Sequence, residues 1–529
     1  MRCWGRLLPW SRFIRDNFWK EKTLTKGFAT HEGARSYMEQ NSSVSYGELN
    51  GTGLLASQAG FGCYRVDETD PEHEKSLRKA LLSGINLIDT SSNYGDGGAE
   101  KLVGEVLEDM VSSGAIARES VIVVSKVGYL QGQNYQISQE RKRQGRPFKD
   151  LILYADGLEH SIHPEFIDDQ LTRSLERLKL DTLDFYLLHN PEYYLSWASK
   201  TGVPLVEARQ EYYSRIEQAF QHLETEVERG RIRFYGISSN TFPSPAADPE
   251  FTSLVQVWEI AQSLSSDHHF RLIQLPMNLM ETGGITEKNQ AKGQSVLEFA
   301  RDKKLGVLIN RPLNAIAYNK LLRLAEVKAT QGASVKDINE LADELIYSEE
   351  LLKNKIFAKL HLAPATQSQV MEQLATGAVL KQNWQSFGTY ERWQELQKYY
   401  FLPRVKGVFR FLIQQGDLAE EISLWVNSHQ KKLEVVLEAV ASSYREEAAK
   451  RCGQIKKRLS SVDVDWSEAA TLSQMAVRAL RSTAGITTVL VGMRREAYVE
   501  DVLEELARPV EKKERTESWH ELQTIRGNY

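Results

Sequence analysis

Short apolar runs alternate with amphipathic segments along most of the chain. Short apolar runs bounded by turn residues are typical of buried strands, and apolar residues three and four positions apart are typical of helices. The runs predict strands at 61–63, 85–88, 121–125, 182–188, 233–237, 271–275, 306–309 and 487–491. Helical spacing occurs between them, at 71–83, 100–112, 164–179, 211–229, 251–263, 295–303 and 473–482. This alternation predicts an α/β fold, a closed parallel (β/α)8 TIM barrel.

Other segments add to this barrel. Two short strands within 43–60 flank Asn50-Gly51, a strong signal for an N-terminal β-hairpin. A large helical insertion, 319–471, precedes the eighth strand, repeats leucines at helical spacing and carries no recognisable chemistry, so we expect a structural cap. The barrel would then comprise 43–318 and 472–507, followed by a C-terminal tail, 508–529. The polar segment 127–163 is expected to be a lid, a binding loop or a disordered loop.

The N-terminal segment 1–30 is rich in basic and bulky apolar residues and contains two acidic ones, Asp16 and Glu21. This mixture predicts a transit peptide for the mitochondrion or another organelle, and we place the segment outside the fold. The alternative is a disordered basic extension of a cytoplasmic protein.

Composition narrows the function classes. Of 529 residues, 41% are hydrophobic and 26% are charged, as in a large globular enzyme, and the formal net charge of -5 argues against nucleic-acid binding. The three cysteines, Cys3, Cys63 and Cys452, are too few and too scattered for a disulfide framework or a zinc site, so we expect no metal. No apolar run reaches the roughly 18 residues of a membrane span.

Four ionisable residues follow or end predicted strands and could share one site. Asp89 and Tyr94 come after the second strand, Lys126 after the third and His189 after the fourth. A phenol is a useful proton donor at neutral pH when a nearby cation favours its phenolate, and Lys126 could be that cation. A carboxylate such as Asp89 would keep a buried lysine charged, and His189 could orient a substrate oxygen.

Each of these residues also has a structural interpretation. The segment around Asp89 could be a simple turn, Lys126 a solvated side chain and His189 an interior histidine. The catalytic interpretation is favoured because the four residues occur at barrel-like spacings in the order of a known enzyme family, which is described below.

A further candidate site follows the eighth strand. Gly492, Arg494 and Arg495 precede a helix predicted at 496–506. Backbone amides and the dipole at a helix N-terminus favour anions, so this turn could bind a dinucleotide phosphate, although basic surface turns are common.

The order Asp-x4-Tyr, Lys after a Val-rich strand, Leu-Leu-His and Gly-x-Ser-x-Asn resembles the aldo-keto reductases, over 44–318 and 472–506. The resemblance implies a TIM barrel that moves hydride between a nicotinamide dinucleotide and a carbonyl or alcohol. It implies Tyr94 as general acid/base, Asp89 and Lys126 as its tuning partners and His189 as the group that orients the substrate. It also implies that the nicotinamide carboxamide is lined by Ser239, Asn240 and Gln274.

Cofactor preference and substrate are less closely specified. Arg494 or Arg495 would contact a 2'-phosphate, which favours NADP (NADPH), with NAD possible. Arg311 stands in a segment that departs from the family pattern and could contact a cofactor phosphate or a substrate acid group. The substrate is expected to be an aldehyde, ketone or sugar, and the oligomeric state is left open. The alternative function is a cofactor-binding regulatory or scaffold subunit with weak turnover.

Overall fold

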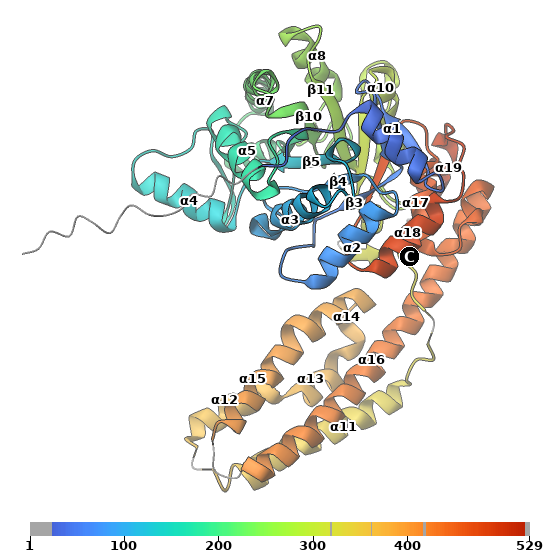
Figure 1. Cartoon of the computed structure of the whole chain (residues 1–529). Helices are drawn as coiled ribbons and strands as arrows, with labels where there is room; N and C mark the ends of the chain where they lie inside the picture. Colours follow the sequence, from blue (N-terminus) through green and yellow to red (C-terminus); the bar gives the residue numbers. More distant parts are fainter. Residues whose placement is uncertain (1–23, 318–319, 329, 361, 416–418, 524–529) are drawn as a thin grey trace, which may run out of the picture. The chain divides into compact units, whose positions relative to one another are not determined.

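The structure, a computed structural model, describes residues 24–317, 320–328, 330–360, 362–415 and 419–523. These residues fall into two compact units (Figure 1). One unit contains the chain up to Pro312 together with Val477–Gln523, and the other contains Leu313–Ala476. Among the described residues, no helix combines the length and the apolar character that crossing a bilayer requires.

The first unit is a closed barrel of parallel strands, as predicted. In chain order the strands are β3 (Ala59–Gly62), β4 (Leu87–Asp89), β5 (Ile122–Val127), β9 (Leu183–His189), β10 (Ile232–Ser238), β11 (Phe270–Pro276), β12 (Gly306–Asn310) and β15 (Thr488–Val491). The strand β15 pairs with β12 on one side and with β3 on the other, which closes the ring. All carboxyl ends therefore meet at one mouth.

Helices lie between successive strands and after β15, and they surround the barrel (Figure 1). They are α2 (Pro71–Leu82), α3 (Gly98–Ser112), α5 (Pro164–Leu178), α7 (Leu205–Glu228), α8 (Leu254–Leu264), α10 (Val296–Asp302), α17 (Leu472–Arg481) and α18 (Glu496–Leu506). Several begin at the caps that the sequence offers. Asp70 accepts the N–H of Glu72 at the start of α2, and Ser295 forms a capping box at the start of α10.

The predicted hairpin is present at the opposite end of the barrel from this mouth. Strands β1 (Tyr46–Leu49) and β2 (Leu54–Ser57) pair antiparallel, with Leu49 opposite Leu54. Gly51 in the turn has φ +73°, a conformation that glycine adopts without strain. Leu49 and Leu54 are buried in the same apolar cluster as the inward-facing strand residues, so the hairpin covers one end of the interior.

The chain joins the barrel earlier than expected. Residues 24–30, which the sequence analysis placed outside the fold, run beside α5 and β9. The N–H of Thr25 donates to the carbonyl oxygen of Lys179 at 2.7 Å, and the N–H of Ala29 donates to Asp184 at 2.6 Å. The helix α1 (His31–Gln40) follows. Residues 1–23, on which most of the targeting prediction rests, lie outside the described residues.

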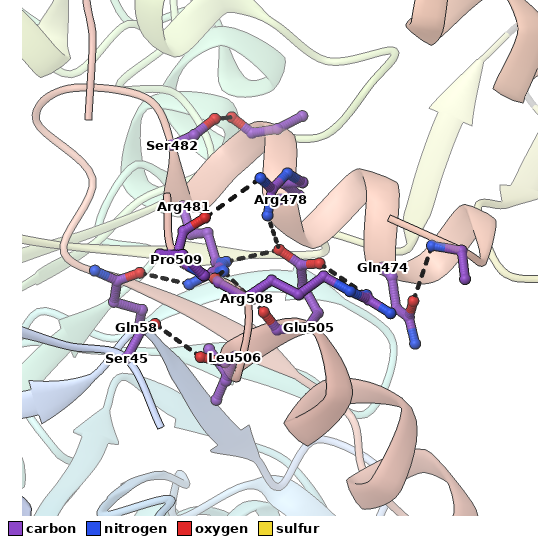
Figure 2. A network of polar contacts seen from close by, with 12 residues as sticks. Ser45, Gln58, Gln474, Arg478, Arg481, Ser482, Glu505, Leu506, Arg508 and Pro509 are labelled. Carbon is purple, nitrogen blue, oxygen red and sulfur yellow. Dashed lines mark hydrogen bonds and ion pairs between the residues drawn. The ribbon is translucent and has the colours of Figure 1, made fainter. Parts of the chain in front are cut away.

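A buried polar network ties α17 and α18 to the start of the barrel (Figure 2). The Glu505 carboxylate, fully buried, pairs with Arg481 at 2.9 Å, Arg478 at 3.2 Å and Arg508 at 3.3 Å. Arg481 also donates to Gln58, directly before β3, at 2.8 Å. Because a buried carboxylate is costly without partners, the network fixes the helices on either side of β15.

Two segments are more ordered than the sequence indicated. The predicted tail, 508–529, contains the helix α19 (Thr516–Gln523), whose Trp519 is fully buried. The predicted loop 127–163 forms β6 (Tyr129–Leu130), α4 (Gly132–Arg143), β7 (Ile152–Ala155) and β8 (Leu158–His160), with the strands in the order β6-β8-β7. The polar composition of α4 leaves it without a clear apolar face, so periodicity could not reveal it.

The second unit is mainly helical, as the leucine spacing predicted. It begins with a short pair of strands, β13 (Asn314–Ala317) and β14 (Lys320–Arg323). Its helices are α11 (Val335–Leu351), α12 (Pro364–Leu374), α13 (Thr376–Asn383), α14 (Tyr390–Leu396), α15 (Leu402–Ile413) and α16 (Ala419–Val462). Leu345, Trp393 and Val436 are fully buried in its core, so this unit packs around a hydrophobic centre of its own.

Candidate active site

The polar side chains at the barrel mouth are placed by strand alternation. An apolar cluster fills the barrel interior, and on a strand the residue two positions further points to the same side. The cluster residues Leu87, Val124, Leu187, Leu272 and Leu308 are followed, two positions later, by Asp89, Lys126, His189, Gln274 and Asn310. These five polar side chains therefore lie one layer above the apolar cluster, at the carboxyl ends of their strands.

Lys126 forms the centre of this layer. Its side chain is fully buried, and its Nζ lies 2.8 Å from either carboxylate oxygen of Asp89. The ammonium also donates to the carbonyl oxygen of Thr90 at 2.9 Å and to the Tyr94 hydroxyl at 3.4 Å. These acceptors match the three N–H groups of an ammonium, so the burial of this charge is compensated.

Tyr94 follows β4 in a short helical turn, η1 (Tyr94–Gly97). The Nζ of Lys126 lies 4.9 Å from the centroid of its ring. Burial, and secondly the Asp89 carboxylate, raise the pKa of Tyr94 well above 10. Tyr94 is therefore a neutral phenol at pH 7 and has a proton to donate. Lys126, the cation that the sequence predicts beside this phenol, lies within hydrogen-bond distance of it and is paired with Asp89.

His189 faces Tyr94 across the mouth. The two rings are edge to face, with centroids 6.0 Å apart, and His189 Nδ1 lies 3.1 Å from the Ser91 hydroxyl oxygen. Burial, followed by the charge on Lys126, lowers the pKa of His189 well below 6.5. The imidazole is therefore neutral at pH 7, with one ring nitrogen that carries a proton and one that accepts.

A second polar group lies beside Asp89. The amide of Gln274 donates to Asp89 at 2.8 Å, and its oxygen accepts from the Ser238 hydroxyl at 2.8 Å. Asn310 donates to the same Gln274 oxygen at 3.4 Å, and its own Oδ1 is buried without a hydrogen-bond partner among the described residues. The side-chain amides of Gln274 and Asn310 carry N–H donors, and Asn310 Oδ1 is an acceptor that is free within the described part of the chain. Such a set fits a primary amide such as a nicotinamide carboxamide, which both donates and accepts hydrogen bonds.

Ser238, which was not among the residues predicted from the sequence, belongs to this polar group. Ser238 is opposite His189 and Gln274 in the strand register, whereas the Ser239 hydroxyl lies 3.2 Å from that of Thr241 and 3.4 Å from that of Thr252. Alternation along β10 from the inward-facing Phe234 could have identified Ser238. The backbone N–H of Asn240 donates to the Glu192 carboxylate at 2.8 Å.

Aromatic residues of the ordered 128–163 segment border His189. The ring of Tyr129 lies edge to face with His189 at a centroid distance of 4.7 Å, and its hydroxyl donates to that of Tyr193 at 2.9 Å. Tyr193 stacks on Tyr154 with centroids 3.8 Å apart. His160 Nε2 lies 2.8 Å from the backbone oxygen of His189. This segment therefore forms one wall beside His189.

The remaining predicted residues lie at other strand ends. Gly492 directly follows β15, and Arg495 is the N-cap of α18, with an extended backbone and an exposed side chain. Arg494 precedes it and is half-buried. Arg311, after β12, pairs with Glu281 at 2.9 Å and has φ +54°, so its guanidinium already has an acidic partner in this structure.

One group of side chains outside the mouth has the composition of a metal site. Ligand atoms of Asp168, His222 and Glu226 lie within 4.8 Å of one another. Glu226 pairs with Arg229 at 2.9 Å and Arg231 at 2.7 Å, and Arg231 also pairs with Asp168. The arginines occupy the carboxylates, so these residues do not fit a cation.

Together, the fold and the mouth define a (β/α)8 barrel with a buried lysine–carboxylate pair, a phenol and an imidazole at the ends of neighbouring strands. Comparison with known proteins agrees with this class. A model of the Aldo/keto reductase family matches residues 59–360, more than half of the chain. The chain belongs to this family.

Individual relatives are distant. The chain is 24% identical over 272 residues to aldo-keto reductase YhdN of Bacillus subtilis, a match that covers 50% of this chain and 61% of the relative. It is 27% identical over 206 residues to an NADPH-dependent D-xylose reductase of Meyerozyma guilliermondii, covering 36% of this chain and 50% of that protein. The matched segment thus spans less than two thirds of either relative. A solved structure of glycerol dehydrogenase AKR11B4 from Gluconobacter oxydans is 15% identical, with a TM-score of 0.43, covering 89% of this chain and 93% of that one.

Proposed function

We propose that this protein is an NADP-dependent oxidoreductase of the aldo-keto reductase type. It would transfer hydride between a nicotinamide and a carbonyl or alcohol, with an aldehyde, ketone or sugar as substrate. The observation that carries the proposal is the convergence of Asp89, Tyr94, Lys126 and His189 at one barrel mouth, where Lys126 Nζ lies 2.8 Å from Asp89 and 3.4 Å from the Tyr94 hydroxyl.

Tyr94 would act as the general acid. Its hydroxyl is protonated at pH 7 and could give a proton to the carbonyl oxygen as the hydride arrives. The buried Lys126 ammonium, 3.4 Å away, would then stabilise the phenolate that forms. Asp89 holds that side chain in place through a bond of 2.8 Å.

His189 would orient the substrate oxygen. The Ser91 hydroxyl donates to Asn93 Oδ1 at 2.6 Å and lies 3.1 Å from His189 Nδ1. If the hydroxyl turns to donate to Nδ1 when substrate binds, the ring proton is on Nε2 and can be donated to the substrate. A neutral imidazole suits this role, because a charged one would repel the adjacent Lys126 ammonium.

The cofactor would bind across the mouth. Ser238, Gln274 and Asn310 would hold the carboxamide, together with Asn240, and the bound nicotinamide would supply or accept the hydride. The turn Gly492 to Arg495 at the start of α18 would hold the 2'-phosphate of NADP. The names of the relatives include an NADPH-dependent and an NAD(P)H-dependent D-xylose reductase and an NADH-specific methylglyoxal reductase, so both cofactors occur among them. The preference for NADP, with NAD as the second choice, rests on the two arginines of this turn.

A purely regulatory or scaffold role is less well supported. Burial of Lys126 with its carboxylate partner has a desolvation cost that cofactor binding alone does not require. The direct test is to incubate the purified full chain with NADPH and panels of aldehydes, ketones and aldoses, and to follow NADPH oxidation. We expect substrate-dependent turnover with at least one carbonyl class. Tight NADPH binding without any such turnover would favour the regulatory alternative.

A further inference from the structure

Glu192 lies in the turn between β9 and α6 (Tyr193–Thr201), three residues after His189. Its side chain is buried, with an exposed fraction of 2% for the residue. Oε1 accepts the backbone N–H of Asn240 at 2.8 Å, and Oε2 is enclosed without a hydrogen-bond partner among the described residues. A buried carboxylate is costly unless donors surround it, and the donors here include the Asn240 N–H and the Ser239 hydroxyl of the proposed carboxamide turn. None of the steps above uses this carboxylate.

The position of this bond explains what it can do. The last backbone bond between β9 and β10 joins the N–H of Asn190 to the carbonyl oxygen of Ser238 at 2.8 Å. The next hydrogen bond of a backbone group between the segments that follow these strands runs from the Asn240 N–H to the Glu192 carboxylate. It lies two residues beyond Asn190 on one segment and two residues beyond Ser238 on the other. It therefore ties the residues that follow Ser238 to those that follow His189.

We propose that Glu192 is a positioning residue, whose carboxylate holds the backbone of Asn240, and with it Ser238, where the carboxamide site requires them relative to His189. This inference rests on the proposed function and adds a residue to it. The ionised form should perform this role better than the protonated one, because hydrogen bonds to a charged acceptor are about twice as strong as neutral ones.

The electrostatic surroundings place the change of charge near neutral pH. Burial is the main cause that raises the pKa of Glu192, to about 7, while the Asn240 N–H, the N–H of Glu192 itself and the Ser239 hydroxyl oppose the rise. The nearby Glu250 adds to the rise. Burial, together with the charge of this carboxylate, also raises the pKa values of three nearby phenols, those of Tyr129, Tyr193 and Tyr212. These phenols therefore stay neutral near pH 7.

The sign follows from these causes. Because the fold raises the pKa of Glu192, the protonated form is favoured below about pH 7 and the carboxylate forms as the pH rises through that value. The bond to Asn240 therefore strengthens with rising pH. The contribution of Glu192 to cofactor affinity should be largest on the alkaline side of its pKa.

The test compares the wild-type full chain with Glu192→Gln, which keeps the shape and an acceptor oxygen but cannot ionise. NADPH dissociation constants are measured by fluorescence titration about one pH unit below and above the pKa of Glu192. We expect the ratio of the variant's constant to the wild-type constant to rise from about 1 to about 5 between the two conditions. Use of the ratio cancels the titration of NADPH itself.

Glu207→Gln is the control for the same chemical change, since Glu207 is an exposed glutamate in the first turn of α7. It should keep the wild-type NADPH affinity within about twofold. Hydrogen exchange at the Asn240 amide provides a second measurement without cofactor. That amide should exchange faster in Glu192→Gln than in the wild-type chain on the alkaline side.

A ratio that is the same at both pH values, or unchanged exchange at Asn240, would overturn the role of Glu192. A wild-type chain that binds no NADPH would instead overturn the proposed function, and this inference with it. The two failures are distinguishable because the first is read from the variant and the second from the wild-type protein.

Discussion

The catalytic end and the phosphate end of the candidate site are held in different ways. At the catalytic end, Asp89, Lys126 and His189 lie on strands, are buried and are bonded to one another or to close neighbours. At the phosphate end, Arg495 is exposed at the start of a helix, and Arg311 is paired with Glu281. Strand ends thus fix the proposed proton transfer, whereas loop residues would bind the cofactor phosphates.

This difference indicates how each end should respond to substitution. Buried, mutually bonded groups lose a large free energy when one partner is removed, because the other is left uncompensated. Exposed charges contribute less and are screened by salt. Substitutions at the catalytic end should therefore have large effects on turnover and stability, and those at the phosphate end should have moderate effects on cofactor choice.

The largest effect is expected for Tyr94→Phe. Removal of the hydroxyl removes the proton donor and leaves the ring in place, so kcat for carbonyl reduction should fall by about 10²- to 10⁴-fold. NADPH affinity should stay close to that of the wild-type chain. Steady-state kinetics and fluorescence titration measure the two quantities.

Tyr347→Phe serves as the control for this variant, because Tyr347 is an exposed tyrosine of the helical unit. It should leave kcat unchanged. Wild-type turnover in Tyr94→Phe would remove Tyr94 from the mechanism and with it the proposed division between the two ends.

The next effect concerns stability. Asp89→Asn leaves the buried Lys126 ammonium without its carboxylate, and loss of one partner from a buried ion pair costs about 3 kcal/mol or more. The free energy of unfolding in urea should fall by about that amount. Glu68→Gln, which removes a partly exposed pair with Lys101 at 3.3 Å, should cost less than about 1 kcal/mol. Equal losses would show that burial does not distinguish the two pairs.

The pH dependence of the reaction sharpens the same contrast. Carbonyl reduction needs protonated Tyr94 and neutral His189, and burial raises the pKa of the first and lowers that of the second. At saturating NADPH, kcat/KM should therefore be flat across neutral pH and decline only at high pH. Alcohol oxidation needs the phenolate and should rise by about tenfold per pH unit in the alkaline range. If kcat/KM for carbonyl reduction instead fell as the pH was lowered through about 6.5, His189 would have the pKa of an ordinary histidine.

Much of the catalytic end could be predicted from the sequence, and the reason is local. The side chains of a barrel strand point alternately inward and outward. Asp89, Lys126 and His189 each lie two positions after an inward-facing apolar residue, at the end of a short apolar run that is visible in the sequence. The same rule distinguishes Ser238 from Ser239, but only when the inward face of β10 is known. The rise in the pKa of Tyr94 could not be predicted, because its main cause is the burial of the hydroxyl, which depends on how distant segments pack around it.

Other regions depend on contacts that periodicity does not report. The helix α4 is polar on most sides, and residues 24–30 pack by backbone bonds to Lys179 and Asp184. The helical unit was recognisable from its leucines, but the length of α16, 44 residues, was not. The partner of Arg311, Glu281, lies 30 residues away in sequence and carries no local signal.

The smallest effect is expected at the phosphate end, for the double variant Arg494→Ala and Arg495→Ala. The backbone amides at the start of α18 can bind the phosphates that NADH and NADPH share. The two arginine side chains should therefore contribute mainly to binding the 2'-phosphate, which NADPH alone carries. The dissociation constant should rise by about tenfold for NADPH and by less than about twofold for NADH.

Arg35→Ala, on an exposed arginine of α1 that pairs with Glu39, controls for the loss of surface charge and should change neither constant. Because exposed charges are screened, the NADPH effect should also shrink at high salt, whereas the effect of Tyr94→Phe should not. An equal loss of affinity for both cofactors would remove the 2'-phosphate role of these arginines, and an effect independent of salt would mean that the phosphate end is as enclosed as the catalytic end.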